Sequence, residues 1–99
     1  MMVRYRSRAR DDIDDIYIGI AQDSSERAER TEQAIRLAGE LVGRQPELGV
    51  ALGHRNVRRW PMTDFRYTIF YVIDWDAEVI DVLRVIDGRR VRDLKRVPR

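Results

Sequence analysis

The chain has 99 residues, enough for one domain but too few for two hydrophobic cores. It contains no cysteine, which excludes disulfides and thiolate metal sites, and its 36% charged residues leave a net charge of only +2. No segment has the apolar length of a membrane span or signal peptide, so we expect a cytoplasmic protein that forms one domain over residues 1–99.

The N-terminal part predicts a short strand and then a helix. Residues 2–6 alternate with Val3 and Tyr5 on one side, and Ser7 has a hydroxyl that can cap the helix after them. Apolar residues then recur at helical spacing in a single stripe: Ile13, Ile16, Tyr17, Ile20 and Ala21. The acidic residues fall off this stripe, so we expect them to face solvent: Asp11, Asp12, Asp14 and Asp15.

A second helix is predicted after a break at QDSSE, where Asp23 and Glu26 resemble a capping box. This helix runs from about Ser25 to Gln45 and stops at Pro46. Its apolar stripe is Ala28, Ile35, Ala38, Leu41 and Val42. Because only a few residues separate the two helices, they are expected to form an antiparallel hairpin.

Three further strands are predicted after a loop over residues 46–56. Val57–Trp60 precedes Pro61, which favours an edge position in a sheet. Phe65–Asp74 and Glu78–Asp87 form a hairpin that turns through residues 75–77 and ends at Gly88. The order β-α-α-β-β-β predicts an α+β fold, with the helical hairpin packed on one face of a small antiparallel sheet.

The long hairpin is apolar on both faces. In its first arm Tyr67 and Ile69 alternate with Phe70, and in its second arm strict alternation places Leu83 with Val85. The helices cover only one face, so the other exposes an apolar patch that is larger than monomers usually carry. Either a second copy of the chain or a dedicated protein partner is expected to cover it.

The sequence contains no recognisable catalytic or cofactor motif. His54 lies in a loop without a nucleophile motif, and no acid or histidine spacing predicts a metal or nucleotide site, so we expect neither metal nor cofactor. Six arginines gather on the predicted sheet: Arg58, Arg59, Arg66, Arg84, Arg89 and Arg90. Such a set suits RNA phosphates or the acids of a protein partner, and whether Arg66 and Arg84 share a face depends on the hairpin register.

The whole chain resembles the RelE/ParE toxin superfamily of bacterial toxin–antitoxin systems. The resemblance rests on the element order, PELG after the second helix, VRRWP, YTIFYVID and VIDVLRVIDGRR. RelE-type members are ribosome-dependent mRNA endonucleases, with an arginine inside the strand matching Tyr67–Tyr71, another after the last strand's glycine, and a C-terminal tyrosine or histidine. Here Thr68 replaces the first arginine, Arg90 matches the second, and the tail RVRDLKRVPR has neither tyrosine nor histidine. The resemblance therefore favours the ParE-like branch, which poisons DNA gyrase.

That resemblance implies a non-enzymatic toxin that stabilises the gyrase–DNA cleavage complex, touches DNA only indirectly, and is neutralised by a ParD-like antitoxin. The candidate target-binding residues are Arg89, Arg90, Arg92, Lys95 and Arg96. An antitoxin segment is expected to cover the second sheet face, with candidate contacts at Trp60, Arg66, Phe70, Val72, Val82 and Arg84. The alternative is a RelE-like mRNA endonuclease with a divergent arginine set, and a dimeric interaction module without toxicity would share the same fold.

Overall fold

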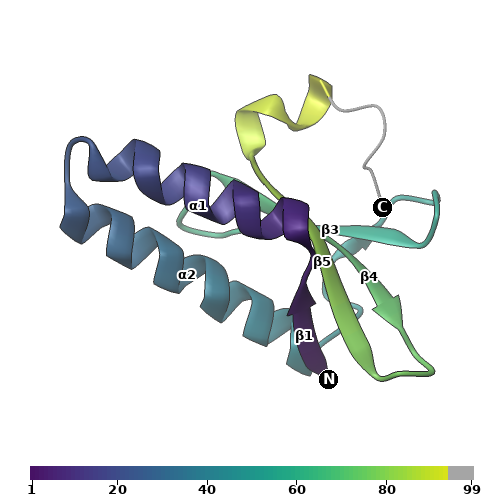
Figure 1. Cartoon of the computed structure of the whole chain (residues 1–99). Coiled ribbons are helices and arrows are strands. Elements are labelled where there is room, and N and C mark those ends of the chain that lie inside the picture. Colours follow the sequence, from purple (N-terminus) through teal and green to yellow (C-terminus); the bar gives the residue numbers. More distant parts are fainter. Residues whose placement is uncertain (94–99) are drawn as a thin grey trace.

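Two helices pack on one face of a five-stranded sheet in the computed structural model, which describes residues 1–93 (Figure 1). The elements, in chain order, are β1 (Met2–Tyr5), α1 (Ser7–Ala21), α2 (Ser25–Arg44), β2 (Val50–Ala51), β3 (Val57–Pro61), β4 (Tyr67–Asp74), β5 (Val79–Asp87) and the 3-10 helix η1 (Gly88–Asp93). The predicted α+β fold with a helical hairpin is confirmed. Within the described residues, no helix is long and apolar enough to cross a membrane.

The sheet has the order β1-β5-β4-β3-β2 and is mixed rather than antiparallel. β1 pairs with β5 in parallel. Parallel strands need a long connection, and here the chain passes through both helices and through β2, β3 and β4 between them. The short strand β2 lies inside the predicted loop and pairs with the outer side of β3. The expected edge position of Val57–Trp60 is therefore wrong, and β2 forms that edge.

Both helix starts differ by one residue from the predicted caps. Arg6 is still extended because its backbone N–H donates to the Val82 carbonyl, so Ser7 becomes the first helical residue of α1 and does not cap it. In α2 the cap is Ser24 rather than Asp23, since the Ser24 hydroxyl accepts the Arg27 N–H at 3.1 Å. The predicted apolar stripes still face the sheet, where Ile13, Ile35 and Val42 are buried.

A β-bulge in β5 decides which side chains share a face. Phe70 pairs with Arg84 and Tyr71 pairs with Val82, so Leu83 is an extra residue on β5. Strict alternation is therefore wrong along this strand: Val85 joins the core under the helices, whereas Leu83 packs on the opposite face. One inserted residue reverses the assignment of every position beyond it.

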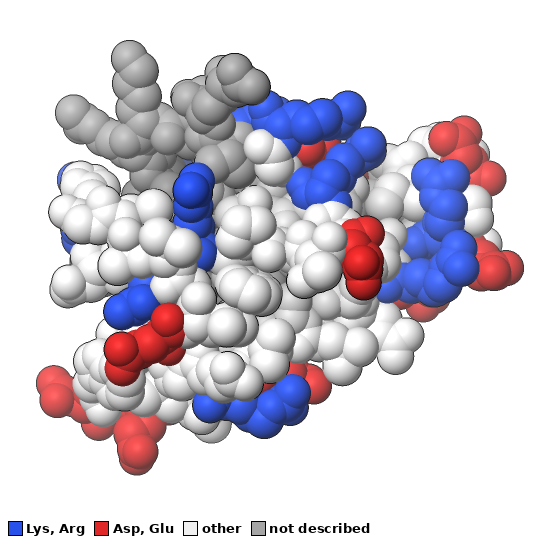
Figure 2. Space-filling model, turned by 180° about the vertical axis from the view of Figure 1, so that it is seen from behind, with Lys and Arg blue, Asp and Glu red and all other residues white. Residues whose placement is uncertain are grey.

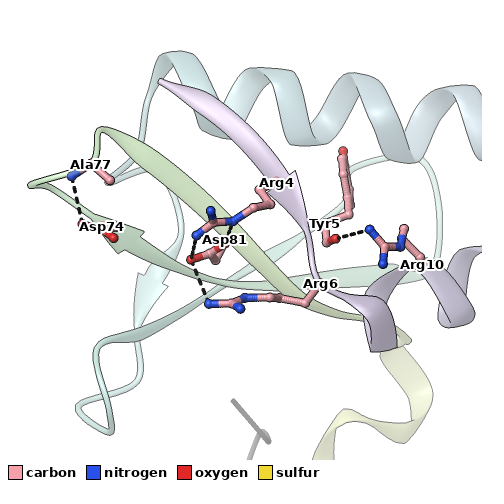
Figure 3. A network of polar contacts seen from close by, with 7 residues as sticks. All are labelled: Arg4, Tyr5, Arg6, Arg10, Asp74, Ala77 and Asp81. Atoms are coloured by element: carbon pink, nitrogen blue, oxygen red, sulfur yellow. Dashed lines mark hydrogen bonds and ion pairs between the residues drawn. The ribbon is translucent and has the colours of Figure 1, made fainter.

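An ion-pair cluster joins β1 to β5 on the face away from the helices. The buried carboxylate of Asp81 accepts hydrogen bonds from Arg4 at 2.6 and 3.1 Å and from Arg6 at 3.3 Å (Figure 3). These contacts hold the pKa of Asp81 below its usual value, with the Arg4 hydrogen bond as the main cause. Two cations around one buried acid anchor the short edge strand.

Candidate functional site

A hollow among the described residues lies between α1, the start of β4 and the end of β5. It is an open groove of about 670 Å³. Apolar side chains from both layers form its floor: Ile16, Ile20, Tyr67 and Val85. Ile86 also borders the groove, although its side chain packs in the cluster on the opposite sheet face. Charged side chains form its rims: Arg8, Asp12, Asp15, Asp23, Arg27, Arg66, Arg84, Asp87 and Arg90. An apolar floor with charged rims suits a polypeptide segment better than a small apolar molecule.

Asp12 joins α1 to β5 beyond the end of β1. Its carboxylate accepts two hydrogen bonds from the Arg84 guanidinium, at 2.8 and 3.0 Å, and one from the Val85 N–H at 2.9 Å. The last residue of β1 pairs with Val82, so β1 does not reach this N–H and the Asp12 carboxylate accepts it instead. The hydrogen bond to Asp12 raises the pKa of Arg84. The expectation that Asp12 faces solvent is therefore wrong.

Asp87 organises the neighbouring end of the groove, where η1 begins. It accepts Arg89 through the backbone N–H at 2.9 Å and the guanidinium at 3.0 Å, and it pairs with Arg66 at 3.2 Å. The hydrogen bond from the Arg89 side chain is the main reason why the pKa of Asp87 lies below its usual value. The Gly88 N–H also donates to the Arg66 carbonyl. These contacts fix the first residues of η1 against the start of β4.

Only some of the predicted target-binding residues lie within the described part of the chain. Arg89 and Arg90 are exposed on η1, and Arg90 lines the groove. Arg92 also belongs to η1, whereas Lys95 and Arg96 lie outside the described residues. The structure therefore brings Arg90 together with Arg66 and Arg84, which come from the other predicted set.

The six predicted antitoxin contacts do not form one surface. Trp60 and Val82 pack in the core beneath the helices, whereas Phe70 and Val72 lie on the opposite face of the sheet. Arg66 and Arg84 line the groove, so the register places these two on one site. The expectation that Val82 shares a face with Phe70 is wrong, because alternation places these residues on opposite sides of the sheet.

The second sheet face is not an exposed patch in the single chain. Its five apolar side chains form a small core of their own and are at most 7% exposed: Val57, Phe70, Val72, Leu83 and Ile86. The bulge adds Leu83 to this group, and Arg59 lies beside Phe70 with a buried Nε that has no hydrogen-bond partner among residues 1–93. Because Arg59 is paired with Phe70 across β3 and β4, its side chain lies on the same face as this cluster. These five side chains are therefore not the exposed apolar patch that the sequence predicted, and antitoxin contact with this face stays a prediction.

On the face that Figure 2 shows, charged side chains are spread out rather than gathered in one strip. Seen from behind the view of Figure 1, a broad area without charged side chains is surrounded by acidic and basic groups of both signs (Figure 2). Within the described residues, no group of three or more histidines and acids is placed to hold a metal ion. His54 is exposed in the loop between β2 and β3. The polar contacts of the groove are therefore arginine–aspartate pairs.

Comparison with known proteins identifies relatives of this chain. Residues 3–92 match the model of a family described as the ParE toxin of the type II toxin–antitoxin system parDE. A solved structure of the chromosomal ParDE TA system from P. aeruginosa contains a similar chain, with a TM-score of 0.75 and 18% sequence identity over 88% of this chain and 95% of that one. At this identity the likeness concerns the fold alone. No curated protein matches the sequence.

Proposed function

This chain belongs to the ParE toxin family of type II toxin–antitoxin systems, and from that membership we propose that it inhibits growth by binding DNA gyrase. In this proposal the protein stabilises the complex between gyrase and cleaved DNA. A cognate ParD-like antitoxin binds the toxin and prevents this. Toxin, target and antitoxin would act in the cytoplasm.

The observation that carries this proposal is the environment of Thr68. This residue occupies the strand position where RelE-type nucleases have an arginine, and it is only 4% exposed, opposite Ile86 on β5. A buried threonine cannot present a fixed positive charge to a phosphate in a transition state. The absence of that charge favours a toxin that acts by binding over one that cleaves RNA.

The cations at the end of β5 are the proposed contact with the target. Arg89 and Arg90 are exposed there, while Asp87 anchors the start of η1 to β4. An arginine held at a rigid strand end can bind acidic groups of gyrase or the phosphates of DNA within the complex. Asp87 pairs with Arg89 among these cations, and this local neutralisation favours contact with DNA through gyrase over direct wrapping of DNA.

One observation favours a second candidate function, a ribosome-dependent mRNA endonuclease. Arg66, Arg84 and Arg90 line a single groove, and Arg90 follows Gly88 as in the nuclease branch. However, Arg84 is already bonded to Asp12 and Arg66 to Asp87. Pairing with carboxylates lowers the positive potential available to an RNA phosphate, which makes this the weaker candidate.

The test is induction of the chain alone, with separate measurements of gyrase-mediated DNA cleavage and of transcript integrity. Purified chain is also added to gyrase, plasmid DNA and ATP, and linearised plasmid is quantified. We expect filamentous growth, a DNA damage response, intact transcripts and accumulation of linear DNA. Prompt cleavage of ribosome-bound transcripts without linear DNA would replace this proposal with the endonuclease.

A further inference from the structure

An exposed tryptophan lies at the end of the sheet opposite the groove. The groove borders Tyr67 at the start of β4, whereas Trp75 follows Asp74 at the end of this strand. Trp75 is 56% exposed and belongs to neither of the two apolar clusters, while Trp60 packs against the core under the helices. A large aromatic face is therefore accessible at the turn between β4 and β5.

The turn between β2 and β3 lies beside this tryptophan and has a strained backbone. Arg55 and Asn56 have φ angles of +51° and +58°. The Val57 N–H donates to the His54 carbonyl at 3.0 Å, which closes the turn as in a type I′ hairpin. Asparagine tolerates this left-handed conformation, whereas arginine is strained in it and glycine would not be. An arginine kept at a strained position points to a role for its side chain.

The two turns line one hollow of about 450 Å³, called the turn pocket here. Arg55, Arg58 and Trp75 line it, and none of the residues 1–93 that line it is an aspartate or a glutamate. Arg58 donates to the uncharged backbone carbonyls of Glu47 and Gly49, at 3.3 and 2.7 Å. Within the described part of the chain, neither Arg55 nor Arg58 forms an ion pair. The turn pocket therefore combines an exposed indole with two arginines that no carboxylate neutralises.

We propose that the turn pocket binds an unpaired nucleobase of a single nucleic acid strand together with the neighbouring phosphates. Trp75 offers a face on which a base stacks, and Arg55 and Arg58 offer guanidinium groups to phosphate oxygens. An acidic peptide would satisfy the arginines but not the indole face, and a duplex hides its base faces within the stack, so a single strand fits better than either. This inference does not rest on the proposed function, because neither gyrase nor an antitoxin takes part in the binding.

The first test measures binding of the purified full chain to a fluorescein-labelled oligothymidine strand of about ten nucleotides by fluorescence anisotropy. We expect this strand to bind at least about tenfold more tightly than its duplex with oligoadenosine, since only the single strand exposes its base faces. The Kd should rise with salt concentration, because phosphate contacts release counterions. Thymidine monophosphate should compete at least about tenfold less well than the unlabelled strand, because it lacks the neighbouring phosphates.

Variants of the two turns test which side chains bind. Trp75→Ala should weaken binding by about tenfold or more, whereas Trp75→Phe keeps an aromatic face and should stay within about threefold of wild type. The control Leu37→Ala removes an apolar side chain of similar exposure, 55%, and should change nothing. Arg55→Gly should weaken binding by about threefold to tenfold and yet raise the Tm by about 2–4 °C, because glycine relieves the strained φ. Arg30→Gln, on an exposed part of α2, is the matched loss of charge and should leave binding unchanged.

Three results would overturn the assignment to a nucleic acid strand. Equal binding of single strand and duplex, unchanged by Trp75→Ala, would mean nonspecific attraction to phosphate. Competition by an oligoglutamate of about ten residues as strong as that by the strand would assign the turn pocket to an acidic polypeptide. Equal competition by thymidine monophosphate would assign it to a free nucleotide. A preference for the single strand that Trp75→Ala abolishes, Trp75→Phe keeps and Arg55→Gly weakens in a more stable protein supports the proposal.

Discussion

At the residue scale, the Asp81 carboxylate makes the free energy of unfolding depend on pH. Its pKa is held low in the folded state by Arg4 and Arg6, so the folded chain binds this proton less readily than the unfolded chain does. The stabilisation is therefore complete above the unfolded pKa of about 4 and is lost as the pH falls through the lower folded pKa.

This argument predicts that Asp81→Asn lowers the free energy of unfolding by about 1–3 kcal/mol at pH 7, with a smaller difference from wild type at pH 3. Urea unfolding at both pH values measures the effect. Asp76→Asn, at the exposed tip of the β4–β5 hairpin, is the matched control and should change little. Equal losses for Asp81→Asn at pH 7 and pH 3 would contradict the assigned role of the carboxylate.

Thr68 provides a second test at this scale, because it separates the two branches of the superfamily. We predict that Thr68→Arg does not create RNA cleavage, since the position is buried and the Arg84 charge is already paired. The same change should lower stability by about 2 kcal/mol or more, because a charged side chain replaces a buried one.

The matched control for that experiment is Thr63→Arg, in the exposed loop before β4. It adds the same charge without disturbing the sheet and should leave stability within about 0.5 kcal/mol of wild type. Both proteins are assayed by ribosome-bound transcript cleavage and by thermal unfolding. Cleavage by the Thr68→Arg protein would mean that the remaining arginines already form a nuclease site.

At the element scale, the β4–β5 turn contains a strained residue. Glu78 has a φ of +56°, a left-handed conformation that disfavours residues with a Cβ. Glu78→Gly should therefore raise the free energy of unfolding by about 0.5–1 kcal/mol, after the greater freedom of glycine in the unfolded chain is subtracted.

The neighbouring Ala77→Gly serves as control, because Ala77 is not among the residues with positive φ and its N–H donates to Asp74. That variant gains flexibility without relieving strain and should be no more stable than wild type. Chemical denaturation of the two variants side by side measures the difference. An Ala77→Gly protein as stable as the Glu78→Gly protein would show that strain at residue 78 is not the cause.

Elements with periodic patterns were predictable, and features set by distant contacts were not. The apolar stripes placed both helices, and alternation placed both arms of the long hairpin within two residues of their observed starts. The bulge at Leu83 leaves no mark in an alternating sequence, so the sides of Val85 and Ile86 were assigned wrongly. Likewise Asp12 lies 72 residues from Arg84, and nothing local to α1 indicates that the two meet.

At the scale of the whole molecule, the proposed target-binding cations follow the elements that make up the fold. The sheet, both helices and both sides of the core are formed by residues before 88, and the main contacts of η1 are with β4 and β5. We therefore predict that a chain stopped after Gly88 still folds, with a loss of no more than about 3 kcal/mol, and still binds the antitoxin. It should no longer arrest growth, because the proposed target-binding cations after Gly88 are missing.

A full-length variant shows whether the truncation acts by removing positive charge or by removing the C-terminal residues themselves. Replacing Arg90, Arg92, Lys95 and Arg96 by glutamine keeps the length and spares Arg89, whose guanidinium is bonded to Asp87. If charge recognises the target, this protein should match the truncated chain: colony counts after induction return to the uninduced level, and the antitoxin is still retained in a pull-down. If both proteins still arrest growth, the cations after Gly88 do not belong to the target-binding site. Loss of antitoxin binding in the glutamine variant would instead assign these cations to the neutralising interface, because the folded core before Gly88 is unchanged by the substitutions.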